Sequence, residues 1–242
     1  MVSASPKFSP LYRQAKAVLV QSLQTGEWQA GQVIPSEQEL AARLGVSQGT
    51  VRKAIDELVA ENMLIRRQGR GTFVASHGDA SDQFRFLRLR PLTGDYVEPT
   101  SEPLECWRAK AGQEAAKNLA VDLGEPIIIV RRLLKFAGKP MAVDEVYLPG
   151  ELFGGLNLDV LQAWTGSLYG LYESRYSVRI VRASERIRAV AADKNVASML
   201  GVANNLPVLS IERIAYTYSD RPVEWRRSLY LTEEFCYQNE LV

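Results

Sequence analysis

The 242-residue sequence predicts an α+β protein that is built in two parts. Two short amphipathic segments within residues 36–61, separated by a glycine, predict a pair of packed helices. A basic, glycine-rich run at residues 63–74 follows them directly and is typical of a β-hairpin. In the second half, a pattern that recurs after about 81 residues predicts an antiparallel sheet with a few helices.

Composition excludes several classes of protein. The net charge is +1, and 46% of the residues are hydrophobic, as in an ordinary globular chain. The two cysteines, Cys106 and Cys236, lack metal-ligand spacing, and the single histidine, His77, lies in a polar stretch. No apolar run reaches the ~18 residues that span a bilayer, and the N-terminus lacks the apolar core of a signal peptide. We therefore expect a cytoplasmic protein with no membrane contact, no metal, no cofactor and no catalytic residues.

The first 75 residues, here called the head, begin with two helices whose ends can be recognised in the sequence. A run at residues 10–12 opens a helix that extends to about residue 25. Ser36 starts the next helix, because Ser36 and Glu39 have the spacing of a capping box. Gly45 ends that helix, as a glycine in the left-handed conformation commonly does.

A third helix, over about residues 47–61, has the outer face expected of a recognition helix. In a helix-turn-helix, residues at the start of the second helix meet base edges, while hydroxyl and basic groups hold phosphates. Gln48 suits adenine, and Arg52 suits guanine or a phosphate. The outward face carries Ser47, Gln48, Gly49, Thr50, Arg52 and Lys53.

The basic hairpin predicts a wing beside that helix. Residues 63–67 and 72–74 have the pattern of its strands. Arg66, Arg67 and Arg70 lie within five residues, and the negative potential of a minor groove attracts arginine. The alternative is a solvated basic face. The capped helix pair, the glycine turn and the hairpin occur together in order, which favours DNA binding.

The head also resembles a known family. The runs that carry the resemblance are Pro10-Leu11-Tyr12, Ile34-Pro35-Ser36-Glu37, Glu39-Leu40-Ala41, Leu44-Gly45-Val46-Ser47, Thr50-Val51-Arg52 and Arg67-Gln68-Gly69-Arg70-Gly71-Thr72-Phe73-Val74. With them, residues 10–75 resemble the winged helix-turn-helix of the GntR family of bacterial transcription regulators. Pattern and resemblance together predict these DNA contacts: Ser36, Gln38, Ser47, Gln48, Gly49, Thr50, Arg52, Lys53, Arg67, Gly69 and Arg70.

Two departures from that family bear on the DNA sequence. Members often carry arginine where this chain has Gln38 and Gln48. The operator is therefore expected to differ from the common family sequence. Binding is also expected to depend less steeply on salt, because fewer phosphates are neutralised.

Residues 76–83 are small and polar and predict a linker, which leaves a DNA-binding domain at 1–75 and a second domain at 84–242. Within the second domain, residues 123–140 and 205–222 resemble each other, with Arg132 and Arg213 81 positions apart. Helices are expected at about 112–120, 166–174 and 191–200, and a long strand at 178–189. The repeat predicts two similar units about a pseudo-twofold axis, and a cleft shared by the two units would be a natural ligand site.

The last strand of the repeat presents polar groups on one face. Glu224, Arg226, Ser228 and Tyr230 alternate along it, so their side chains point the same way. Such a face is either solvated or turned toward a ligand. The alternation of side chains along the strand leaves both interpretations open.

The second domain resembles the UTRA effector-binding domain of the HutC-type subfamily of GntR regulators, whose fold is similar to chorismate lyase. The residues that carry the resemblance are Arg132, Gly138-Lys139-Pro140, Tyr147-Leu148-Pro149, Ser167-Leu168-Tyr169, Ile211-Glu212-Arg213 and Arg221-Pro222-Val223-Glu224. The resemblance implies a chorismate-lyase-like antiparallel sheet with helices. It also implies an effector pocket formed by Phe86, Arg88, Arg132, Asp144, Ser167, Tyr169, Glu224 and Tyr230.

One departure concerns the effector. Members that sense sugar phosphates usually carry a second arginine two residues after the first, where this chain has Leu134. A doubly charged phosphate would lose one bidentate partner. A carboxylate or another singly charged metabolite is therefore favoured over a sugar phosphate.

These observations predict a ligand-responsive transcription regulator, in the first instance a repressor. A homodimer would bind a pseudo-palindromic operator in double-stranded DNA, and a small anionic metabolite would release it. An enzyme of the chorismate lyase type fused to a DNA-binding head is the first alternative, but no nucleophile–base pair is visible. An effector-free DNA-binding dimer is the second, and the polar positions Arg132, Ser167 and Glu224 argue against it.

Overall fold

The computed structural model describes residues 9–76, 87–94 and 98–239. The chain divides into two compact units, Met1–Ser76 and His77–Val242. Apart from Ser76, the predicted linker at 76–83 lies outside the described residues, as does Phe86. Among the helices of the described ranges, none is long and apolar enough to cross a membrane.

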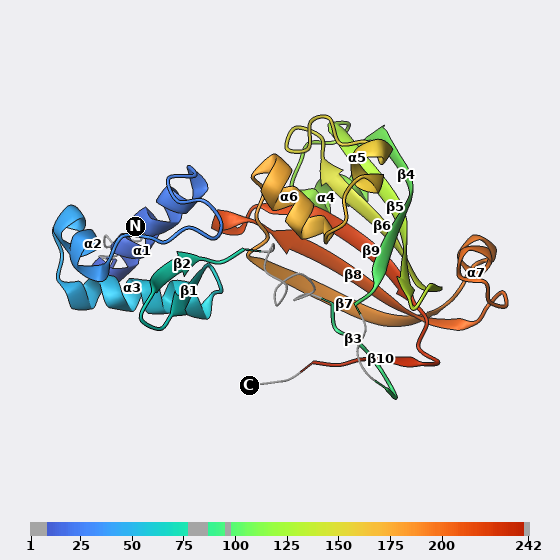
Figure 1. The fold of residues 1–242 in the computed structure, drawn as a ribbon. Helices are drawn as coiled ribbons and strands as arrows, with labels where there is room; N and C mark the ends of the chain where they lie inside the picture. Colours follow the sequence, from blue (N-terminus) through green and yellow to red (C-terminus); the bar gives the residue numbers. More distant parts are fainter. Residues whose placement is uncertain (1–8, 77–86, 95–97, 240–242) are drawn as a thin grey trace, which may run out of the picture. The chain divides into compact units, whose positions relative to one another are not determined.

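The first unit consists of three helices followed by a two-stranded wing (Figure 1). Its elements are α1 (Leu11–Gln24), α2 (Glu37–Leu44), α3 (Gln48–Ala60), β1 (Leu64–Arg67) and β2 (Gly71–Val74). Each element begins and ends within one residue of the range that the sequence predicts. The head is therefore determined mainly by local sequence.

Hydrogen bonds at the helix ends explain this agreement. The Ser36 hydroxyl accepts a bond from the Glu39 N–H, and the Glu39 carboxylate accepts one from the Ser36 N–H, which completes the predicted capping box. Gly45 has a φ of 64° at the end of α2, where other residues would be strained. The Ser47 hydroxyl accepts a bond from the Thr50 N–H and so fixes the start of α3.

The second unit is organised around a six-stranded antiparallel sheet with the strand order β4-β5-β6-β9-β8-β7. Its strands are β4 (Thr100–Lys110), β5 (Pro126–Phe136), β6 (Lys139–Pro149), β7 (Arg182–Ala191), β8 (Pro207–Tyr216) and β9 (Pro222–Tyr230). Its helices are α4 (Gln113–Leu119), α5 (Leu158–Gln162), α6 (Leu168–Tyr176) and α7 (Lys194–Leu200), with a 3₁₀ turn η1 (Tyr218–Asp220). A separate pair joins β3 (Leu89–Pro91) to β10 (Phe235–Tyr237).

The strand order follows from the repeat. The first copy runs β4, α4, β5, β6, and the second runs β7, α7, β8, β9. The two copies meet through the central antiparallel pair of β6 and β9, so a pseudo-twofold axis passes between these strands. The predicted α+β class and the predicted pair of similar units are confirmed.

Two features of the second unit differ from the prediction or were not predicted. The strand expected at 178–189 begins only at Arg182, because Val178 and Ile180 instead turn into the core beneath α6. The β3–β10 pair joins segments that are far apart in sequence and too short to carry a periodic signal.

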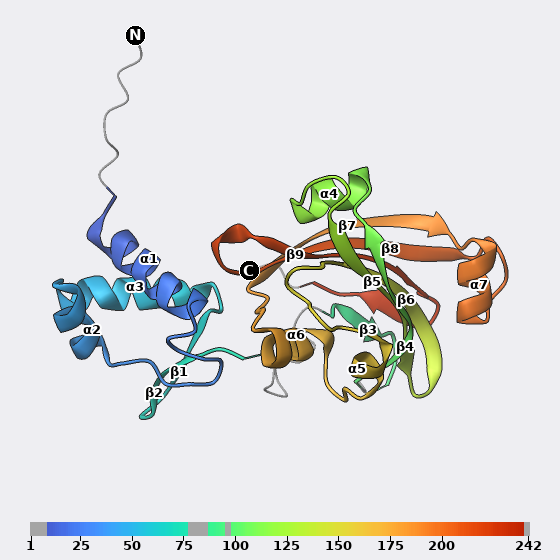
Figure 2. The same ribbon diagram turned by 90° about the horizontal axis from the view of Figure 1, so that it is seen from above.

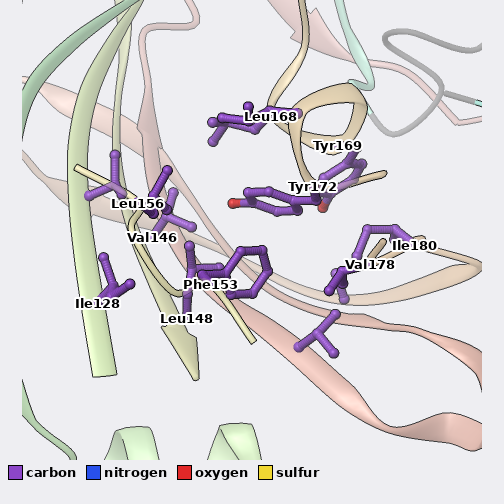
Figure 3. Close-up of a cluster of buried hydrophobic side chains, with 14 of the residues drawn as sticks. Ile128, Val146, Leu148, Phe153, Leu156, Leu168, Tyr169, Tyr172, Val178 and Ile180 are labelled. Carbon is purple, nitrogen blue, oxygen red and sulfur yellow. The ribbon is translucent and has the colours of Figure 1, made fainter. Parts of the chain in front are cut away.

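Helices cover both faces of the sheet. Figure 2 shows α4 on the opposite side of the sheet from α5 and α6. Beneath α5 and α6, Phe153, Leu156 and Tyr172 pack with Ile128, Val146 and Leu148 of the strands (Figure 3). This apolar cluster fixes α6 against the sheet, and the first turn of α6 borders the cavity described below.

The other face carries a row of alternating charges between α4 and α7. Neighbouring positions across all six strands are occupied by Glu105, Arg131, Glu145, Arg227, Glu212 and Arg186. Opposite charges on adjacent strands stabilise a sheet. Every charge in the row therefore has an opposite charge beside it on a neighbouring strand.

A close backbone approach explains Gly150, just after β6. A Cβ atom at this position would lie 2.7 Å from the carbonyl oxygen of Pro126, which already accepts a hydrogen bond from the Gly150 N–H. We expect Gly150→Ala to lower the free energy of unfolding by about 2 kcal/mol in urea titrations. Gly154→Ala is the control, because nothing lies within 4 Å of a Cβ there. Equal losses at the two glycines would contradict the proposed clash.

Candidate functional site

The predicted DNA contacts lie on the outer surface of the head. Ser36, Gln38, Ser47, Gln48, Gly49, Arg52, Lys53, Gly69 and Arg70 are exposed, and Thr50 and Arg67 are half-buried. One groove is lined by Ser36 and Gln38 at the start of α2, Gln48 of α3 and Arg70 of the wing. The structure thus brings together predicted contacts from three separate elements.

Aromatic rings hold two of the basic side chains in this surface. The Lys53 ammonium lies 4.0 Å from the centre of the Tyr12 ring. The Arg67 guanidinium lies 4.9 Å from the centre of the Phe73 ring. Such cation–π contacts restrict long side chains that would otherwise be mobile, while the charges remain available to phosphates.

The second unit contains a cavity of 540 Å³, a size typical of small-molecule sites. It lies on the face of the sheet that α6 covers, and strands from both copies of the repeat contribute to it. The lining residues are Leu87, Glu98, Pro99, Thr100, Ser101, Arg132, Leu134, Trp164, Thr165, Gly166, Ser167, Leu168, Tyr169, Arg213, Arg226 and Tyr230. The wall therefore combines apolar and polar side chains, and three of its charged residues are arginines.

The three arginines are Arg132 of β5, Arg213 of β8 and Arg226 of β9, each only 6% exposed. Arg132 and Arg213 occupy equivalent positions in the two copies of the repeat, 81 residues apart. Three guanidinium groups that converge on one cavity form an anion site, because arginine presents several N–H donors in a fixed plane.

Each of these arginines has a carboxylate partner. Arg132 donates to Asp144 at 2.9 Å through Nε and at 2.8 Å through Nη2, and Nη1 donates to the Ser101 hydroxyl at 3.2 Å. Arg213 pairs with Glu185 at 2.5 Å. The network of three arginines and three carboxylates is completed by Arg226.

Arg226 is the central member of the network. Its Nη2 donates to Glu224 at 2.8 Å, and its Nη1 lies 3.5 Å from Asp144. Its Nε is buried and, within the described residues, has no hydrogen-bond partner. A buried donor without an acceptor is costly, so an arriving anion would gain by supplying the acceptor.

Glu224 ties α6 to this network. Its carboxylate is fully buried and accepts hydrogen bonds from the Tyr169 hydroxyl at 3.0 Å and the Tyr172 hydroxyl at 2.9 Å. The two tyrosines are one helical turn apart on α6, so one carboxylate fixes the rotation of the helix against β9. The first turn of α6, with its N-cap Ser167, is thereby held beside the cavity.

Burial and neighbouring charge determine protonation in the network. Burial and then the charge of Glu224 raise the pKa of Tyr169 to about 12, so its hydroxyl stays a donor at neutral pH. Burial alone would raise the pKa of Asp144, but Arg132 and Arg226 outweigh it and hold that pKa below its ordinary value. Asp144 is therefore ionised at neutral pH, between Arg132 and Arg226.

The predicted effector residues fall into three groups. Arg132, Ser167, Tyr169 and Tyr230 line the cavity. Asp144 and Glu224, expected to contact the effector, are instead fully buried behind the arginines, because they serve as counter-ions. Arg88 is exposed next to β3 and is not among the lining residues, and Phe86 lies outside the described residues.

The sequence interpretation missed Arg213 and Arg226 as lining residues. Arg213 was visible as the repeat partner of Arg132, and Arg226 shares a strand face with Glu224. The loop residue Trp164 was also missed. Its indole N–H donates to the Ser167 carbonyl, and its ring covers Gly166 so closely that a Cβ there would lie 2.9 Å from Nε1.

Two protein families match the chain. The family described as UTRA domain matches residues 95–235, and the family described as bacterial regulatory proteins, gntR family, matches residues 11–74. The chain is 30% identical to the transcriptional repressor NagR of Bacillus subtilis, over 94% of this chain and 93% of NagR. It is 27% identical to the mannosyl-D-glycerate transport/metabolism system repressor MngR of Escherichia coli, over 94% of each chain.

Solved structures of GntR-family regulators are also similar to this chain. The ligand-binding domain of a GntR-family transcriptional regulator from Bordetella bronchiseptica is 45% identical, with a TM-score of 0.64, over 65% of this chain and 98% of that domain. PhnF from Mycobacterium smegmatis is 25% identical, with a TM-score of 0.56, over 94% of this chain and 99% of PhnF.

Proposed function

The chain belongs to the GntR family of bacterial regulatory proteins and carries a UTRA domain, and on this premise we propose that it is a homodimeric repressor released from its operator by a small anionic metabolite. GntR regulators bind DNA, and UTRA domains bind small-molecule effectors. The family consists of transcription regulators rather than enzymes, so the cavity is a sensor. We place the protein in the cytoplasm, where its DNA target would lie.

One observation carries the proposal of an anionic effector. Arg226 lines the cavity, is buried, and keeps an Nε–H without an acceptor within the described residues. Arg132 and Arg213 reach the same cavity from the two halves of the sheet. An effector carboxylate or phosphate would supply an acceptor for that N–H group.

The charge balance favours a singly charged effector, with a carboxylate ahead of a sugar phosphate. The three arginines are already matched by Asp144, Glu185 and Glu224. A doubly charged group would therefore enter a site with no net positive charge. Leu134 also lines the cavity with an apolar side chain. By the resemblance described above, members that sense sugar phosphates usually carry a second arginine at this position.

On the DNA side, we propose that two heads of a homodimer bind a pseudo-palindromic operator. Recognition helices would then lie about one helical turn, ~34 Å, apart. An effector that moves the dimer from mostly bound to mostly free must favour the released state by about 5 kcal/mol. The predicted linker at 76–83 is the segment proposed to absorb the change.

A thermal-shift screen followed by one substitution tests this function. Metabolites with one carboxylate, and sugar phosphates matched to them in size, would be screened against the purified chain. A true effector at about 100 times its Kd should add about 2.7 kcal/mol of stability. Arg132→Gln should abolish release of operator DNA by that effector and leave DNA affinity unchanged.

Arg131→Gln is the matched control, because Arg131 is the adjacent residue on the opposite face of the sheet. It should respond to the effector as the unsubstituted chain does. Tight binding of a sugar phosphate with no response to any carboxylate would refute the preference for a carboxylate. Normal release by the effector in Arg132→Gln would refute the assignment of the cavity as the sensor.

A further inference from the structure

Glu37 is an acidic side chain in the groove that the predicted DNA contacts line. Glu37, the first residue of α2, is bonded to side chains from two other elements of the head. Its carboxylate accepts from Gln48 Nε2 at 3.4 Å and Arg52 Nε at 2.9 Å, both of α3. It also accepts from Arg66 Nη2 of β1 at 3.3 Å. A carboxylate that faces DNA phosphates is unfavourable, so its position needs a reason.

The contact with Arg52 orients its guanidinium. Only Nε of Arg52 is bonded to Glu37, and its terminal nitrogens have no other partner within the described residues. The side chain is 59% exposed. The outer edge of the guanidinium, formed by the two terminal nitrogens, is the edge that binds O6 and N7 of guanine. Glu37 thus binds Nε of Arg52 and leaves the two terminal nitrogens available to bind guanine.

The contact with Gln48 has the same consequence. One amide N–H is bonded to Glu37, which leaves the second N–H and the carbonyl oxygen available for other contacts. Those two groups form the donor–acceptor pair that matches adenine. Glu37 therefore fixes both side chains of α3 that are suited to read base edges.

Arg66 holds Glu37 from the other side. Its Nη1 contacts Asp56 of α3 at 2.5 Å while its Nη2 contacts Glu37. Arg66 is therefore occupied by two carboxylates and braces the wing strand β1 against both helices. This arrangement positions Glu37 and reduces the positive charge that Arg66 adds to the surface.

We propose that Glu37 is a positioning residue for sequence recognition, which orients Arg52 and Gln48 and weakens attraction to DNA of any other sequence. The proposal rests on the proposed function, in which α3 reads the operator. It predicts that loss of the carboxylate weakens binding to the preferred sequence and strengthens binding to random DNA. Specificity, rather than affinity alone, is the property that should change.

The test uses a duplex obtained by selection from random DNA with the full-length chain, and a random duplex of equal length. Glu37→Gln should bind the selected duplex about 10-fold more weakly and the random duplex about 3-fold more tightly. Glu37→Asp keeps the charge but retracts it from Arg52, so only the loss on the selected duplex should appear. In an Arg52→Gln background, the effect of Glu37→Gln on the selected duplex should shrink to about 3-fold, because only Gln48 still depends on Glu37.

Glu57→Gln is the matched control, since Glu57 is also on the head but pairs with Lys16 of α1. It removes the same charge and should leave the ratio of the two affinities unchanged. An unchanged ratio in Glu37→Gln, or an equal change in Glu57→Gln, would overturn the inference while the proposed function stands. If the unsubstituted chain selected no duplex, both would fail. A lower melting temperature with an unchanged ratio would show a structural role and would also overturn the inference.

Discussion

Asp144→Ala is expected to lower the free energy of unfolding by about 3–5 kcal/mol. Asp144 is fully buried between Arg132 and Arg226, which are themselves 6% exposed. Without it, the acceptor that Arg132 keeps within the described residues is the neutral Ser101 hydroxyl. Arg226 would still pair with Glu224, but the buried Arg132 guanidinium would have no carboxylate partner within the described residues. Urea unfolding followed by tryptophan fluorescence measures the loss, because Trp107, Trp164 and Trp225 all lie in the second unit.

Glu145→Ala is the matched control. Glu145 is the next residue along β6, points to the opposite face and is only half-buried, with Arg131 2.9 Å away. Its removal should cost at most about 1 kcal/mol, because solvent reaches this partly exposed ion pair and screens it. A loss at Glu145 as large as that at Asp144 would contradict the account of the buried network.

The loss in Asp144→Ala should also depend on pH. The two arginines hold the pKa of Asp144 below its ordinary value, despite burial. A carboxylate of this kind stabilises the fold above its unfolded pKa of about 3.9, and the contribution disappears as the pH falls through the folded pKa. The difference between the unsubstituted chain and the variant should therefore be constant from pH 5 to 7 and shrink below about pH 4.

Local signals made the head predictable. The capping box of Ser36 and Glu39, the left-handed Gly45 and the cap Ser47 each act within four residues, so the sequence alone places the helix ends. The contacts of Glu37 were not predictable in the same way. They join α2, α3 and β1, and only the folded head brings these three elements together.

The repeat made the sheet predictable. It also related Arg132 to Arg213, a correspondence that the sequence interpretation did not use to predict the cavity. The 81-residue spacing that maps Arg132 onto Arg213 also places both arginines at one cavity. The alternation of side chains along the strand correctly grouped Glu224 with Arg226 on one face. This alternation does not reveal which element covers the face, however. Because α6 packs over Glu224, this residue became a buried counter-ion and not a wall of the cavity.

Glu224→Ala is expected to cost at least about 4 kcal/mol, because three donors lose their acceptor at once. The Tyr169 and Tyr172 hydroxyls would lose the buried carboxylate to which both of them donate. Among the carboxylates of the described residues, Arg226 would keep Asp144, at 3.5 Å. Since Glu224 holds α6 beside the cavity, the variant should also lose its response to the effector. Urea unfolding and effector-induced release of DNA measure the two effects separately.

A second substitution shows how much of the stability lost in Glu224→Ala is due to the unpaired buried charge and how much to packing. In Glu224→Ala combined with Arg226→Met, the unpaired guanidinium is gone, and an unbranched apolar side chain fills part of its volume. Replacing both members of a buried ion pair is much less costly than removing one, so the double variant should be about 2 kcal/mol more stable than Glu224→Ala. The effector response should stay lost, because Arg226 is one of the three arginines at the cavity. A double variant less stable than Glu224→Ala would show that packing around Glu224, rather than uncompensated charge, dominates this part of the core.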